Sequence, residues 1–88
     1  MEQILTEFGF VPHAILLTVP QYRLDYYEHN KIQTHDTLVY YATIDQNKLR
    51  LTRLYATSYE MSTNDFTFNL GTDCEETLKL ILKSTIHE

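Results

Sequence analysis

Histidine and carboxylate side chains are the groups of this sequence that could bind a metal ion. Zinc sites need three or four such ligands, and two of the ligands commonly have two or three other residues between them in the sequence. No histidine pair here has the His-x-x-x-His spacing, and a single cysteine excludes a Cys-x-x-Cys pair. His29 and His35 flank an expected turn and could converge only through a detail of the fold. We therefore expect no metal and no cofactor; the side chains considered are His13, His29, His35, His87, Asp25, Glu28 and Asp36.

Cys74 is the candidate nucleophile of the chain. It lies near the start of an expected helix, where a thiol can have a lowered pKa. Three acidic neighbours, Asp73, Glu75 and Glu76, oppose its ionisation, and Cys74 shares an apolar stripe with Leu78. A packed, unreactive thiol is the favoured interpretation.

Other catalytic and nucleotide-binding patterns have no support in the sequence. The serines lack a Gly-x-Ser-x-Gly context. A phosphate-binding loop needs several glycines, and this chain has only Gly9 and Gly71. Asp25 and Glu28 are interpreted as solvated surface acids. The sequence thus predicts a protein that is not an enzyme.

Length and charge restrict the class of protein further. The 88 residues carry 43% hydrophobic and 22% charged side chains, which predicts one small globular domain over residues 1–88. The net charge of -5 makes the chain acidic and disfavours nucleic acid as its partner. Residues 14–19 form the longest apolar stretch, which is too short to cross a bilayer. With no basic leader before an apolar run and no disulfide, we expect no membrane contact and a cytoplasmic location.

The helices and strands that would position these side chains are predicted from the spacing of apolar residues and from the positions of glycine and proline. Residues 1–8 have helical spacing and end at Gly9, whereas residues 72–85 predict a second helix with Thr72 and Glu75 as a capping box. Residues 10–18 predict a buried strand, with a break at Pro20 and Gln21. The remaining strands are expected at residues 22–28, on both sides of residues 46–47, and at 66–70, with residues 29–31 as a turn and 61–65 as a loop.

The hairpin within residues 37–56 is the clearest local signal. Pairing about Gln46 and Asn47 sets Ile44 opposite Leu49 and Thr43 opposite Arg50, so that apolar residues meet apolar residues. Because Gln-Asn is a weaker tight turn than Asn-Gly, a longer loop remains an alternative.

The expected fold is an α+β two-layer sandwich. It has a mainly antiparallel sheet of four to five strands, with an N-terminal and a C-terminal helix packed on one face. The other face would then be uncovered and rich in tyrosine and arginine, residue types enriched at protein contacts. Its predicted interaction surface comprises Arg23, Tyr27, Val39, Tyr41, Arg50, Thr52 and Leu54.

These residues predict a non-enzymatic accessory or regulatory protein that binds another protein or its own copy, as a heteromer or a homodimer. The alternative is a module that binds a ligand or single-stranded nucleic acid on the same face, with Lys48 and Arg50 as cationic contacts. Uncovered sheet faces are also common in antiparallel proteins without a partner. Edge strands near residues 14–19 and 66–70 offer a further route to self-association.

Overall fold

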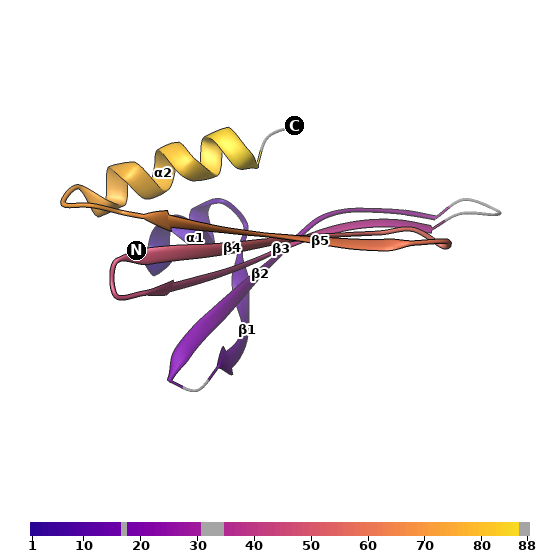
Figure 1. The fold of residues 1–88 in the computed structure, drawn as a ribbon, viewed down its shortest axis with the longest axis horizontal. Helices are drawn as coiled ribbons and strands as arrows, with labels where there is room; N and C mark the ends of the chain where they lie inside the picture. The colour runs from indigo at the N-terminus through magenta and orange to yellow at the C-terminus, as the bar shows by residue number, and fades with distance from the viewer. Residues whose placement is uncertain (17, 31–34, 87–88) are drawn as a thin grey trace.

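Five antiparallel strands form one sheet in which each strand lies beside the next strand of the sequence (Figure 1). The structure is a computed structural model that describes residues 1–16, 18–30 and 35–86. Two helices flank the strands in the chain. In order the elements are α1 (Glu2–Glu7), β1 (Val11–Leu16), β2 (Val19–Asn30), β3 (His35–Asp45), β4 (Lys48–Ala56), β5 (Met61–Asn69) and α2 (Cys74–Thr85).

The β3–β4 hairpin has the register that side-chain pairing predicts. Ile44 lies opposite Leu49, and Thr43 lies opposite Arg50. The loop has two residues, and both Gln46 (φ 51°) and Asn47 (φ 62°) adopt the left-handed conformation that suits the twist of a tight hairpin. The Asn47 side chain donates a 2.6 Å hydrogen bond to the Gly71 carbonyl, which ties this turn to the segment that leads into α2.

Both helices pack on the same face of the sheet, which confirms the two-layer α+β sandwich (Figure 1). Gly9, with φ at +100°, ends the segment that contains α1, as the sequence predicts. The core lies between the helices and this face. Its buried residues are Ile4, Leu5, Phe10, Tyr22, Leu38, Tyr40, Ala42, Leu49, Leu51, Leu70, Leu78, Leu82 and Ile86.

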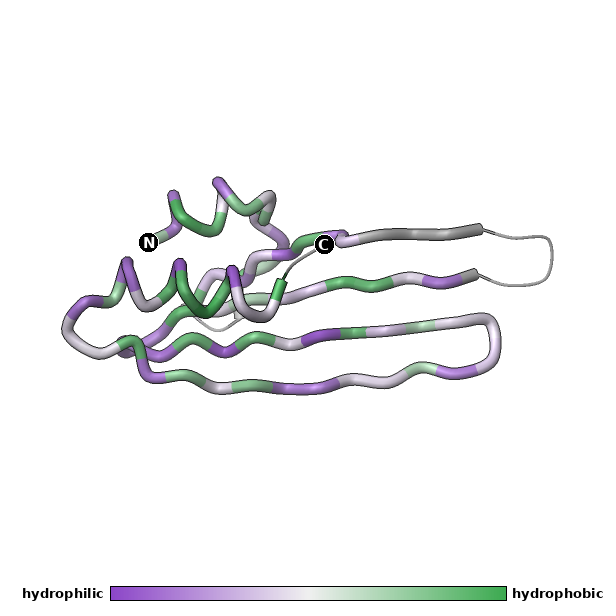
Figure 2. The backbone as a smooth tube through the Cα atoms, turned by 90° about the horizontal axis from the view of Figure 1, so that it is seen from above, coloured by the Kyte–Doolittle hydropathy of each residue, from purple (hydrophilic) through white to green (hydrophobic). Residues whose placement is uncertain are grey.

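The helices cover only part of the sheet. The molecule is 48 Å long, whereas a helix of 12 residues spans about 18 Å. Seen from above, α1 and α2 lie over one half, and the other half of β2 to β5 extends beyond them as a single layer (Figure 2). Tyr40 marks this boundary, because its hydroxyl donates a 3.4 Å hydrogen bond to the Thr85 carbonyl at the end of α2.

Several local predictions were wrong. Residues 61–65 are not a loop but the first half of β5, in continuous register with β4. β2 begins at Val19, so Pro20 and Gln21 lie within the strand instead of breaking the chain. The strand β1 lies at an edge, and its Ile15 side chain is 73% exposed, so the apolar run is not a buried strand.

The start of α2 also differs from the prediction. Its N-cap is Asp73, and no side chain caps the first turn, so the Thr72–Glu75 capping box does not form. Neither described helix has the length and apolar character needed to cross a membrane.

Candidate functional site

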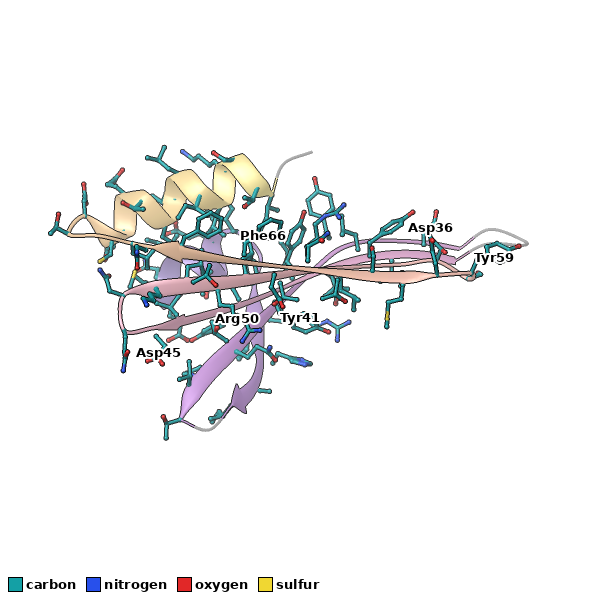
Figure 3. All side chains as sticks on the ribbon, viewed as in Figure 1. Asp36, Tyr41, Asp45, Arg50, Tyr59 and Phe66 are labelled. Atoms are coloured by element: carbon teal, nitrogen blue, oxygen red, sulfur yellow. The ribbon has the colours of Figure 1, made fainter. Side chains whose placement is uncertain are left out.

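The sheet face turned away from the helices, called the open face below, carries alternate residues of the central strands. Arg23 of β2, Tyr41 of β3 and Thr52 of β4 lie side by side across three strands. Because side chains alternate along a strand, Arg50 lies on this face beside Thr52. Figure 3 places Tyr41 and Arg50 on the side opposite Phe66, which faces the helices.

The open face is concave because one end of the sheet bends. β1 and the first part of β2 turn away from the other strands on the side opposite α2 (Figure 1). A bulge lies between Pro12 and Ala14, and the ring of His13 at this bulge lies 5.4 Å from the ring of Tyr41. The chain's own β1 therefore borders the open face without covering its centre.

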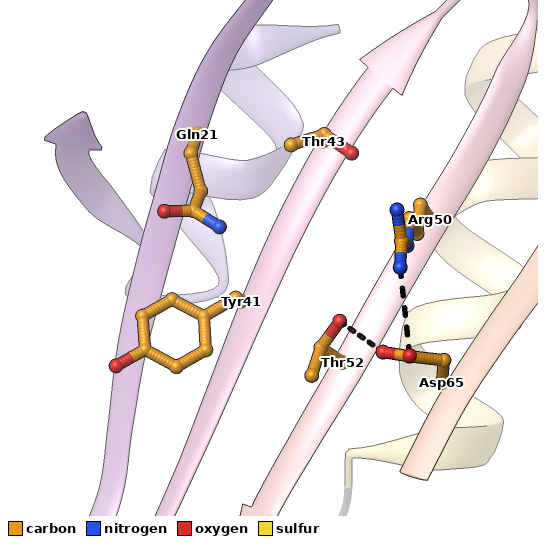
Figure 4. Close-up of a pocket in the computed structure, with 6 residues that line it drawn as sticks. All are labelled: Gln21, Tyr41, Thr43, Arg50, Thr52 and Asp65. Carbon is orange, nitrogen blue, oxygen red and sulfur yellow. Dashed lines mark hydrogen bonds and ion pairs between the residues drawn. The ribbon is translucent and has the colours of Figure 1, made fainter. Parts of the chain in front are cut away.

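Two hollows lie side by side on this concave surface. The first, of about 290 Å³, is lined by side chains from four strands (Figure 4), and the second, of about 300 Å³, shares Thr43 and Arg50 with it. The first is lined by Gln21, Tyr41, Thr43, Arg50, Thr52 and Asp65; the second adds Val19, Asp45, Lys48 and Thr67.

Asp65 supplies a carboxylate to the first hollow, and two side chains of β4 hold it. Its Oδ1 accepts a 2.6 Å hydrogen bond from the Thr52 hydroxyl, and its Oδ2 lies 3.5 Å from Arg50 Nη2. The Thr52 hydrogen bond and the Arg50 charge lower the pKa of Asp65. Arg50 remains 65% exposed and makes only this long contact with Asp65 in the described structure, so its guanidinium can still bind a partner.

Arg23 and Tyr41 form a second polar group at the border with β1. Arg23 Nε donates a 2.9 Å hydrogen bond to Asp25, and its guanidinium lies 5.7 Å from the centre of the Tyr41 ring. The hydrogen bond to Asp25 raises the pKa of Arg23. The Tyr41 ring is thus contacted by both Arg23 and His13, which fixes its position on the open face.

The remaining residues of the predicted surface have different environments. Val39 is only 2% exposed, so it packs among its neighbours and offers no contact area. Thr52 and Leu54 are half-buried on the open face. A bulge in β2 pairs the backbone of Tyr27 with Leu38, and the Tyr27 side chain lies outside the part of the chain that the structure describes.

Asp65, Gln21 and His13 are parts of this surface that the sequence interpretation missed. The sequence predicts a loop at Asp65 and a break between strands at Gln21, whereas the two residues lie within β5 and β2. The alternation of Thr63, Asp65 and Thr67 with the phenylalanines of residues 66 and 68 was the signal that could have extended β5. No local signal indicates that β1 brings His13 against Tyr41, because that contact depends on the bend of the sheet.

Metal-ligating and nucleophilic side chains lie apart from one another in the described structure. Within residues 1–16, 18–30 and 35–86, no three His, Cys, Asp or Glu side chains come together as a metal site. The side chains of His29, His35 and His87 lie outside the described residues. Cys74 is partly buried and packs against the core.

Comparisons with protein-family models, with curated proteins and with solved structures give no match for this chain.

Proposed function

We propose that this chain is a non-enzymatic accessory or regulatory protein that binds another protein through the concave open face. The observation that carries the proposal is the hollow between Tyr41, Arg50 and Asp65, to which four strands contribute side chains. Strands position side chains more rigidly than loops do, so little conformational entropy is lost when a partner binds. Tyrosine and arginine are also the residue types that dominate binding energy at protein interfaces.

The charges of the hollows favour a particular partner chemistry. Arg50 supplies an exposed cation that the two hollows share, and Lys48 supplies a second exposed cation in the second hollow. Arg50 is held only at 3.5 Å by Asp65, so a carboxylate of the partner can form a shorter, two-pronged hydrogen bond with it. The partner segment is therefore one that presents an acidic side chain to Arg50 beside an apolar group that packs on Tyr41.

The same geometry argues against single-stranded nucleic acid as the main ligand. A nucleic-acid strand carries a phosphate at every nucleotide, and Asp45 and Asp65 beside the cations interrupt the positive groove that such a row of charges needs, whereas a single partner carboxylate needs only Arg50.

A pair of matched charge reversals tests the proposal. Arg50→Glu reverses the charge of the cation that the two hollows share, and Lys79→Glu makes the same charge change on α2, where Lys79 lies 3.9 Å from Glu76. Each variant is immobilised and exposed to extract of the source cells, and the bound proteins are quantified by mass spectrometry. The proposal predicts a protein retained by the wild type and by Lys79→Glu and lost with Arg50→Glu.

Two results would count against the proposal. One is a set of bound proteins that Arg50→Glu leaves unchanged. The other is salt-dependent binding of a single-stranded oligonucleotide that Arg50→Glu abolishes while no protein depends on Arg50, which would support the alternative function.

A further inference from the structure

The strand β5 is an edge of the sheet whose outer backbone groups have no partner strand in the described chain. In the strand order β5 has β4 as its only neighbour. The Leu70 N–H, just after β5, donates a 2.9 Å hydrogen bond to the Asn47 carbonyl and so points toward β4. Since backbone direction alternates in an antiparallel ladder, the N–H and C=O groups of Thr63, Asp65, Thr67 and Asn69 point outward.

This edge lacks the features by which proteins usually prevent strand addition. β5 contains no proline and no lysine, and its nine residues pair with β4 without a bulge. The opposite edge, β1, has both Pro12 and a bulge between Pro12 and Ala14. The difference indicates that β1 is protected against pairing and that β5 is not.

The side chains of β5 are compatible with a second copy of the same strand. Although the chain has a net charge of -5, Asp65 is the only charged residue of β5, and its carboxylate is bonded inward to Thr52 and Arg50 of β4. Phe66 pairs with the buried Leu51 on the helix side of the sheet, yet Phe66 is 42% exposed. The apolar core therefore reaches the edge and ends in a partly uncovered aromatic ring.

We propose that β5 pairs antiparallel with β5 of a second copy of this chain, forming a continuous ten-stranded sheet with all helices on one side. A symmetry axis at Asp65 would place two carboxylates opposite each other. An axis at Phe66 instead pairs Asp65 with Thr67 of the other copy and Thr63 with its Asn69. These pairs, repeated by symmetry, exchange about eight backbone hydrogen bonds, and the two Phe66 rings meet on the helix side.

This contact goes beyond the proposed function, because it uses the edge of the sheet and leaves the open face accessible. The two surfaces are therefore separable by experiment. Thr63→Pro removes another outward N–H of β5 at a residue that lines neither hollow, so it should weaken the dimer and still capture the partner protein.

The test is the mass in solution of the wild type, Thr67→Pro and Thr67→Ala. Proline at this position removes an outward N–H and leaves the ladder with β4 intact. The wild type should have twice the chain mass of 10.4 kDa. Thr67→Pro should raise the dissociation constant by at least about tenfold, and Thr67→Ala should remain dimeric. A wild type that is monomeric at millimolar concentration, or a folded Thr67→Pro that dimerises like the wild type, overturns the proposal.

A disulfide measurement keeps the test decisive if Thr67→Pro does not fold. In a Cys74→Ala background, Phe66→Cys places two thiols in a symmetric pair with Cα atoms about 4.5 Å apart, within the range that a disulfide spans. Asn64→Cys is the control, because this register places residue 64 opposite residue 68. Fast oxidation at residue 66 supports the register, and equal or faster oxidation at residue 64 overturns it.

Discussion

Replacing Leu78 by alanine tests the one-sided core on which the open face depends. Leu78 is fully buried in the same cluster as Leu5, Leu49 and Leu51. Truncating a buried leucine costs about 2–5 kcal/mol of folding free energy. A domain of this size has a total stability of roughly 4–13 kcal/mol. A loss of about 3 kcal/mol would lower Tm by roughly 12–24 °C.

Leu80 provides a matched control on the same helix. It is 65% exposed, so Leu80→Ala makes the same chemical change with little loss of packing and should alter stability by less than about 0.5 kcal/mol. The assay is thermal and urea unfolding of both variants, followed by far-UV circular dichroism. If Leu80→Ala destabilised the protein as much as Leu78→Ala, the assignment of the inner face of α2, and with it that of the open face, would be refuted.

The other predictions concern the hollow and the hairpin turn. Thr52→Val removes the hydroxyl that donates to Asp65, so the lowered pKa of Asp65 should rise toward its ordinary value of about 3.9, whereas Thr43→Val should leave it unchanged in a carboxyl-carbon NMR titration. Because the pKa of Asp65 is lowered in the folded state, the ionised carboxylate stabilises the fold at pH values above its unfolded pKa. This stabilisation is lost as the pH falls through the folded-state pKa. Identical acid unfolding curves for the wild type and Thr52→Val would contradict this assignment. Gln46 adopts φ 51°, a left-handed conformation that asparagine tolerates better than glutamine. Gln46→Asn should therefore stabilise the fold by about 1 kcal/mol, which corresponds to a rise in Tm of roughly 4–8 °C. An unchanged or lower Tm would argue against the tight turn.

The parts of the fold predicted from sequence are those that depend on local pattern. The β3–β4 register follows from apolar residues that match across Gln46 and Asn47, since a one-residue slip would reverse both faces. The helical spacing of residues 1–8 and the stripe of Cys74, Leu78, Ile81 and Leu82 likewise have a spacing of three and four residues that a helix satisfies and a strand does not. These signals were enough to place Tyr41, Arg50 and Thr52 on one face.

The parts that were missed depend on contacts between distant segments. Residues 61–65 have a composition typical of a loop, but β4 supplies a partner strand and Asp65 binds Thr52 and Arg50, so tertiary pairing overrides local preference. The bulges in β1 and β2 add single residues that no periodicity reveals, and the bend of the sheet brings His13 to Tyr41. For this reason the hollow could not be predicted, although several of its residues were.

The most direct test of the open face as a docking surface is oxidative labelling of individual tyrosines in the free chain and in its complex with the captured partner. Labelling of Tyr41 should fall in the complex, because its ring borders the hollow. Tyr59, which is 80% exposed at the far turn between β4 and β5, provides the internal reference and should be labelled equally in both states (Figure 3). Unchanged labelling of Tyr41 in a complex that protects other residues would contradict the account.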